Sequence, residues 1–100
     1  MFKLTDYISK TELEKFCRRN HIIKMSFFGS ALHDELGPGS DIDILVEFDN
    51  DHMPGLLDLA GMEIELTEVF GRKVDLRTPA ELSRYFRDDV LEKAKVEYAA

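Results

Sequence analysis

Two short motifs in the first half of the chain carry residue types that could act on a phosphate ester. Gly29-Ser30 is followed, after ten residues, by Asp41-Ile42-Asp43. Backbone N–H groups at a glycine turn bind phosphate because they are unsatisfied donors, and glycine lets the backbone approach closely. The hydroxyl of Ser30 adds a further donor. We therefore expect Gly29 and Ser30 to hold the phosphates of a nucleoside triphosphate.

The two aspartates are expected to form a cation site. Asp41 and Asp43 lie two positions apart in a run of β-branched and apolar residues, so on a strand their side chains leave the same face. Two carboxylates at this separation repel each other unless a cation lies between them. Mg²⁺ prefers carboxylates together with substrate phosphates. The competing interpretation is an ordinary Gly-Ser turn beside two aspartates that keep an edge strand soluble.

A third carboxylate, Asp75, lies in the short alternating segment 73–78, between Val74 and Leu76. If this segment is a strand that pairs beside the strand of Asp41 and Asp43, the side chain of Asp75 faces the same site. It would then complete a two-metal site and accept the proton of an attacking hydroxyl.

The periodicity of apolar residues and the turn signals predict elements in the order α, β, short α, β, α, β, α. A capping box at Ser9–Glu12 starts the first helix, and Gly61 is expected to make the middle of the third helix irregular. These elements form an α/β (α+β) fold, with a small mixed sheet packed by helices in two layers and a single domain over residues 1–100. The expected segments are helix 10–20, strand 22–28, helical turn 31–36, strand 41–48, helix 54–70, strand 73–78, and a C-terminal helix with the apolar stripe Val90, Leu91, Ala94 and Tyr98.

Composition narrows the class of protein. The net charge is −7, with 13 basic against 20 acidic residues, whereas binding to a nucleic-acid backbone needs a basic face. Direct nucleic-acid binding is therefore disfavoured. No apolar run approaches the roughly 20 residues that span a bilayer, and the N-terminus lacks the apolar core of a secretory signal. The single cysteine, Cys17, is expected to be a buried helix residue in a cytoplasmic, reducing environment.

The segment GSALHDELGPGSDIDILVEF resembles the G-S-x10-D-x-D signature of the minimal nucleotidyltransferases, within the DNA polymerase β superfamily. The likeness continues through GRKVDL, which resembles the segment with that family's third aspartate, and covers nearly the whole chain. It implies that Gly29 and Ser30 hold the triphosphate, that Asp41 and Asp43 bind Mg²⁺, and that Asp75 is the third acid.

Many members of this family are antitoxins paired with HEPN-domain ribonuclease toxins, to which they transfer AMP from ATP onto a tyrosine. The resemblance implies ATP as substrate, two Mg²⁺ ions as cofactor, and a hetero-oligomer with a HEPN toxin. Relatives that modify small molecules or nucleic acids generally carry an extra domain for the acceptor, so we expect a partner protein to bring it. Two alternatives are an antitoxin that only binds its toxin and a small-molecule nucleotidyltransferase.

One departure from the family pattern concerns the phosphates. Family members commonly follow the Gly-Ser pair with arginines, where this chain has Ala31 and His33, and Asp34 replaces the usual glycine. The usual guanidinium clamp is therefore missing. The candidates to replace it are His33, Lys24, Arg72, Lys73 and Arg77.

Overall fold

A four-stranded mixed sheet forms the centre of the protein, with the strand order β3-β2-β1-β4. The computed structural model describes residues 6–29, 41–85 and 87–100. Strand β1 pairs antiparallel with both β2 and β4, and β2 pairs parallel with β3. The elements are α1 (Lys10–Arg19), β1 (Ile22–Phe28), β2 (Ile42–Phe48), the 3-10 helix η3 (Asn50–His52), α2 (Leu56–Phe70), β3 (Val74–Arg77), the 3-10 helix η4 (Pro79–Glu81), α3 (Arg87–Lys93) and β4 (Lys95–Ala99).

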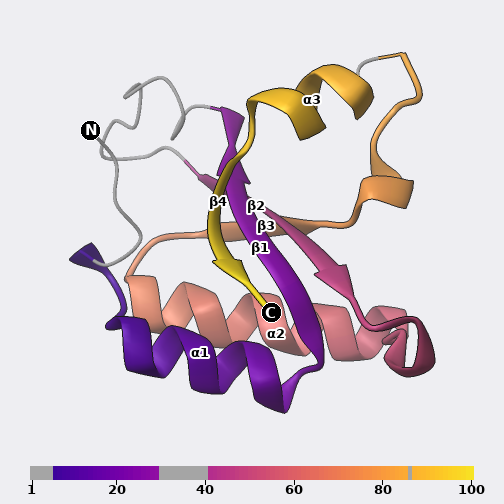
Figure 1. Cartoon of the computed structure of the whole chain (residues 1–100). Coiled ribbons are helices and arrows are strands. Elements are labelled where there is room, and N and C mark those ends of the chain that lie inside the picture. The colour runs from indigo at the N-terminus through magenta and orange to yellow at the C-terminus, as the bar shows by residue number, and fades with distance from the viewer. Residues whose placement is uncertain (1–5, 30–40, 86) are drawn as a thin grey trace.

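Helices α1 and α2 lie together on one side of the sheet (Figure 1). Both helices contribute buried apolar side chains to one core with the strands. From α1 and α2 these are Leu13, Phe16, Cys17, Met62, Leu66 and Phe70. The arrangement confirms the predicted two-layer α+β fold with a small mixed sheet. No helix within the described ranges is both long enough and apolar enough to cross a bilayer.

Helix α1 begins where the capping box predicts. The Ser9 hydroxyl oxygen accepts a hydrogen bond of 3.2 Å from the backbone N–H of Glu12, which satisfies one of the orphan donors of the first turn. Cys17 lies on the inner face of α1 and is fully buried, as predicted. Burial raises the pKa of its thiol to about 12, so the sulfur stays protonated and behaves as a small apolar group.

Helix α2 differs from its prediction in two respects. It is continuous from Leu56 to Phe70, so the expected irregularity at Gly61 is wrong. It also begins at Leu56, two residues after the predicted start at residue 54, and its buried face contains Met62, Leu66 and Phe70. The helix stays regular at Gly61 because it packs against the sheet. These tertiary contacts outweigh the lower helix propensity of glycine, which costs about 1 kcal/mol relative to alanine. The helix ends, as predicted, at a left-handed Gly71 with φ +69°, whose N–H donates to the Thr67 carbonyl.

We expect Gly61→Ala to stabilise the protein. A Cβ at this position would meet no atom within 4 Å, so alanine brings its helix propensity without a clash. The expected gain is roughly 1 kcal/mol, or about 4–8 °C in melting temperature for a domain of this size. Urea unfolding of both proteins measures it. The matched control is Ala60→Gly, at the neighbouring exposed position, which should lose a similar amount; an unchanged or lower stability for Gly61→Ala would contradict the expectation.

The C-terminal helix prediction is wrong beyond Lys93. Helix α3 ends there and Lys95–Ala99 form β4, which pairs with β1. Tyr98, expected on a helical stripe, packs against the core from this strand, and no residue of α3 is buried. The segment VEYA alternates and contains β-branched and aromatic residues, and the free edge of β1 supplies hydrogen-bond partners that an isolated helix lacks. Pro79 lies at the start of the 3-10 helix η4, and the helical turn predicted at 31–36 lies outside the described residues.

Candidate active site

The parallel pairing of β2 and β3 brings two of the predicted carboxylates side by side. Asp43 is in register with Asp75, while the flanking Ile42 is in register with Val74. Ile42 and Val74 are fully buried in the core, so the two aspartates leave the opposite face of the sheet. Both are half-buried. The strand pairing on which the expected site depends is therefore present.

Asp41 lies at the same edge, directly before β2. A side-chain hydrogen bond links it to Asp75, and Lys73 Nζ lies 3.9 Å from Asp41 Oδ2. The backbone N–H of Ile42 donates to the carbonyl of Lys73 across 2.9 Å, which fixes the start of β2 against the start of β3. Asp41, Asp43 and Asp75 thus form one carboxylate cluster, the name we use for them below.

The surroundings of Asp43 and Asp75 favour their protonation or a bound cation. Burial is the main cause that raises the pKa of Asp43, and the charges of Asp75 and Asp41 raise it further. Burial also raises the pKa of Asp75, as do the charge of Asp41 and the hydrogen bond with it. The charges of nearby Lys73 and Arg77 act in the opposite direction on Asp75. Carboxylates this close together repel each other, and a cation bound between them would remove the repulsion.

The donor set fits a hard cation by its chemistry, since carboxylate oxygens are the ligands that Mg²⁺ prefers. Across residues 6–29, 41–85 and 87–100, no group of three or more His, Cys, Asp or Glu is already arranged to hold a metal ion. The ligand roles of Asp41, Asp43 and Asp75 therefore stay predictions.

Gly29 ends β1 directly against the carboxylate cluster. Its φ is +68°, and a Cβ built on it would lie 2.5 Å from Asp43 Oδ2. Phe28, the residue before it, pairs with Asp43 across the ladder. Only glycine fits this position, because it tolerates the left-handed conformation and leaves room for the carboxylate. The expected phosphate contact of Gly29 stays a prediction, and Ser30, Ala31, His33 and Asp34 lie outside the described residues.

Two of the cations expected to replace the family arginines lie near the carboxylates. Lys73 approaches Asp41, and the charge of Arg77 lowers the pKa of Asp43 and Asp75. Lys24 lies elsewhere on the sheet, 3.9 Å from Glu47, its partner on β2. The structure thus favours Lys73 and Arg77 over Lys24 as compensating charges.

Sequence reasoning missed two residues of α2 that hold β3 in place. Thr67 Oγ1 accepts from the Val74 N–H at 3.1 Å, and Glu63 Oε2 accepts from the Leu76 N–H at 2.8 Å. These N–H groups flank Asp75 and point away from β2, so without α2 they would have no strand partner. The sequence contains a signal for this role, because Glu63 and Thr67 are polar residues one helical turn apart, next to the buried Met62 and Leu66.

Comparison with known proteins identifies the family to which this chain belongs. The family described as Nucleotidyltransferase domain matches residues 10–96. A protein of Methanocaldococcus jannaschii named "Putative protein adenylyltransferase" is 38% identical over 76 residues, which cover 76% of this chain and 80% of that protein. A solved structure named "Structure of putative minimal nucleotidyltransferase" is 30% identical, with a TM-score of 0.69 and 82% of each chain covered.

A solved toxin-antitoxin structure with AMP-PNP shares the fold. Its TM-score is 0.75 at 20% identity, and the match covers 93% of this chain and 75% of that one. The family match extends over most of the chain, and the relative from Methanocaldococcus jannaschii exceeds 30% identity over most of both proteins. The chain therefore belongs to the nucleotidyltransferase family and is a nucleotidyltransferase.

Proposed function

We propose that this chain is a Mg²⁺-dependent adenylyltransferase that moves AMP from ATP to a tyrosine hydroxyl of a HEPN-type toxin and so acts as its antitoxin. The observation that carries the proposal is the register of Asp43 with Asp75 on adjacent strands, with Asp41 at the same edge. A cluster of three carboxylates beside a glycine turn is the donor set that metal-assisted transfer from a nucleoside triphosphate requires.

In the proposed reaction, the oxygen of the tyrosine hydroxyl bonds to the α-phosphorus of ATP. The bond from that phosphorus to the bridging oxygen breaks, and pyrophosphate leaves with the electron pair. Asp75 accepts the hydroxyl proton, since its carboxylate lies in register with Asp43 at the edge of the sheet where the substrates would meet. Mg²⁺ held by Asp41, Asp43 and Asp75 would supply neutralising charge at the triphosphate and at the attacking oxygen.

The choice of ATP and of a protein acceptor draws on the relatives. The relative from Methanocaldococcus jannaschii is named as a protein adenylyltransferase. The fold neighbours include a toxin-antitoxin structure with AMP-PNP and a toxin-antitoxin named MntA-HepT. These names describe those proteins; together with the resemblance of the Gly29–Asp43 segment, they motivate the same reaction for this chain.

Intact-mass spectrometry of the toxin tests the proposal. The toxin is incubated with this chain, ATP and Mg²⁺, and we expect it to gain the mass of one or more AMP groups. Omission of Mg²⁺ and addition of EDTA should both prevent the gain, and a Tyr→Phe toxin should stay unmodified. A native toxin that binds this chain but keeps its mass under these conditions would contradict the proposal.

A second candidate, an antitoxin that neutralises its toxin by binding alone, is motivated by Ala31 and His33, which stand where the family commonly has arginines. The two candidates differ in what the carboxylates do. With Asp41→Ala and Asp43→Ala combined, the enzyme proposal expects cells that express the toxin to stop growing. Growth that persists at wild-type rate would favour neutralisation by binding.

A further inference from the structure

Helix α2 presents apolar side chains to solvent on the face that is turned away from the core. Leu56 and Leu57 are 84% and 89% exposed, Ile64 is 61% exposed, and Met53 just before the helix is 63% exposed. Leu57 and Ile64 are two helical turns apart and so lie on one face, with the exposed Ala60 and Gly61 between them. Single exposed apolar residues are normal, but a continuous run along one helix marks an interaction surface.

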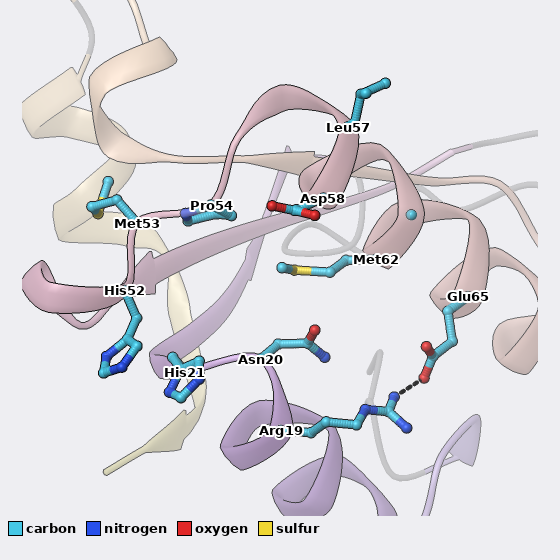
Figure 2. A pocket seen from close by; sticks show the side chains of 11 residues that line it. Arg19, Asn20, His21, His52, Met53, Pro54, Leu57, Asp58, Met62 and Glu65 are labelled. Atoms are coloured by element: carbon cyan, nitrogen blue, oxygen red, sulfur yellow. Dashed lines mark hydrogen bonds and ion pairs between the residues drawn. The ribbon is translucent and has the colours of Figure 1, made fainter.

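A hollow of about 570 Å³ adjoins this apolar face. Its walls come from the end of α1, from η3 and from the first half of α2. Asp58 and Met62 face into the hollow and Leu57 points outward from its rim (Figure 2). At one side of the hollow, the imidazole rings of His21 and His52 stack with their centroids 3.8 Å apart, and this contact stabilises that wall. Gly61 also lines it, and no atom lies within 4 Å of the place of its missing Cβ.

The charges along this surface are mainly negative. Helix α2 carries four acidic residues, Asp58, Glu63, Glu65 and Glu68, and neither lysine nor arginine. Arg19, the one basic side chain that lines the hollow among the described residues, is ion-paired with Glu65. Like charges would oppose the pairing of this face with a second copy of itself or with an anionic membrane, while a basic partner would be attracted.

We propose that Met53, Leu57, Gly61 and Ile64, together with the hollow, dock an amphipathic helix of a partner protein that carries lysine or arginine beside its apolar face. Apolar positions spaced over two helical turns are the pattern with which one helix receives another. An apolar side chain of the partner enters beside Gly61, and its basic residues face Asp58 and Glu68, both of which are exposed. The surface lies where β2 ends, and the carboxylate cluster lies where β2 begins, so docking leaves the cluster open.

Binding of designed peptides tests this inference without any nucleotide. One labelled peptide of about 18 residues, or five helical turns, combines an apolar stripe with lysines, and a second replaces the lysines by glutamates. By fluorescence anisotropy, we expect the intact chain to bind the lysine peptide and not the glutamate peptide. Leu57→Gln and Gly61→Gln should each weaken binding about tenfold or more, as for residues at the centre of an interface. Tyr85→Gln, at a position that is 87% exposed elsewhere, should bind like the wild type.

Several results of this experiment would overturn the inference. They are equal binding of both peptides, no binding of either, or unchanged binding by the Leu57 and Gly61 variants. Light scattering of the wild-type chain gives a further check, because a dimer that Leu57→Gln dissociates would assign the surface to a second copy. Leu57 and Gly61 are exposed and lie in a helix where glutamine is well accepted, so loss of fold does not account for weaker binding.

A second measurement rests on the proposed function and asks whether the docked partner is the protein that is modified. In the transfer reaction with the HEPN toxin, Leu57→Gln should raise the toxin concentration for half-maximal rate about tenfold and leave the rate at saturation unchanged. Identical concentration dependence for variant and wild type would overturn docking of the toxin while the proposed function stands. If the wild type transfers nothing, the proposed function fails, and the peptide experiment still decides whether the surface binds a basic helix.

Discussion

Replacing Asp43 by asparagine should remove nucleotide transfer and at the same time make the fold more stable. Asp43 stands in register with Asp75 and shares the carboxylate cluster with Asp41. Asparagine keeps the shape but not the charge, so a metal ion would lose a counter-charge and the triphosphate would lose the cation that neutralises it. We expect the rate to fall by at least about 10²-fold, the scale on which loss of one electrostatic partner acts in an active site.

The gain in stability has a separate physical cause. Burial and the charges of Asp75 and Asp41 raise the pKa of Asp43 in the folded protein, so the folded state disfavours the ionised form. Like charges opposite each other on neighbouring strands cost about 0.2–1 kcal/mol. The neutral amide of the Asp43→Asn variant relieves this repulsion, and the melting temperature at pH 7 should rise by roughly 1–8 °C.

The pH dependence follows from the raised pKa of Asp43. Its contribution to stability is fully present below the unfolded pKa, about 3.9, and is lost as pH rises through the higher folded pKa. The stability difference between Asp43→Asn and wild type should therefore be largest near pH 7 and vanish near pH 3. Thermal unfolding at the two pH values measures it. Glu47→Gln is the matched control, because Glu47 lies on the same strand near Lys24; it should retain transfer and gain no stability. Full activity in Asp43→Asn would contradict the assigned role.

Gly29→Ala should impair both the fold and the chemistry. Alanine at φ +68° is strained by roughly 1–2 kcal/mol, and its Cβ would lie 2.5 Å from Asp43 Oδ2. Relief of the clash moves the carboxylate or the end of β1. We expect the free energy of unfolding to fall by about 1–3 kcal/mol and the transfer rate to fall about 10²-fold, since displacement by about 1 Å is enough for that loss.

The Gly71→Ala variant separates the effect of backbone strain at a positive φ from the effect of the clash with Asp43. Gly71 has φ +69°, yet a Cβ there would meet no atom within 4 Å. This variant should lose about 1 kcal/mol of stability and retain its transfer rate. Urea unfolding and the initial rate of AMP transfer, measured on both variants, provide the comparison. A Gly29→Ala protein as active as Gly71→Ala would show that the contact between Gly29 and Asp43 is unimportant for the reaction.

The sequence was informative wherever local chemistry and tertiary packing favour the same structure. Ser9 caps α1, Gly71 ends α2, and the buried run of β2 places Asp43 on the face that the alternation predicts. The parallel pairing that sets Asp75 beside Asp43 is not encoded locally. It depends on α2, which crosses between β2 and β3 and binds the N–H groups of β3 through Thr67 and Glu63.

The C-terminal residues show why the remainder could not be predicted. Helical spacing relates four apolar residues near the C-terminus, Val90, Leu91, Ala94 and Tyr98. Tyr98 nevertheless belongs to β4. The strand forms because β1 has an open edge on the side opposite β2, a property of the assembled sheet that no short window of sequence contains. The exposed apolar face of α2 was missed for a related reason: the assembled fold decides which face of the helix meets the sheet, and it leaves Leu57 and Ile64 exposed to solvent.

The most direct test of nucleotidyl transfer follows the two ends of ATP. Parallel reactions contain this chain, its toxin and Mg²⁺, with a radioactive label in either the α- or the γ-phosphate. We expect the α-label on the toxin and the γ-label in pyrophosphate, with both changes prevented by EDTA and by Asp43→Asn. Transfer of the γ-label to the toxin, or neither label leaving ATP while toxin and chain form their complex, would contradict the assignment of the carboxylate cluster to nucleotidyl transfer.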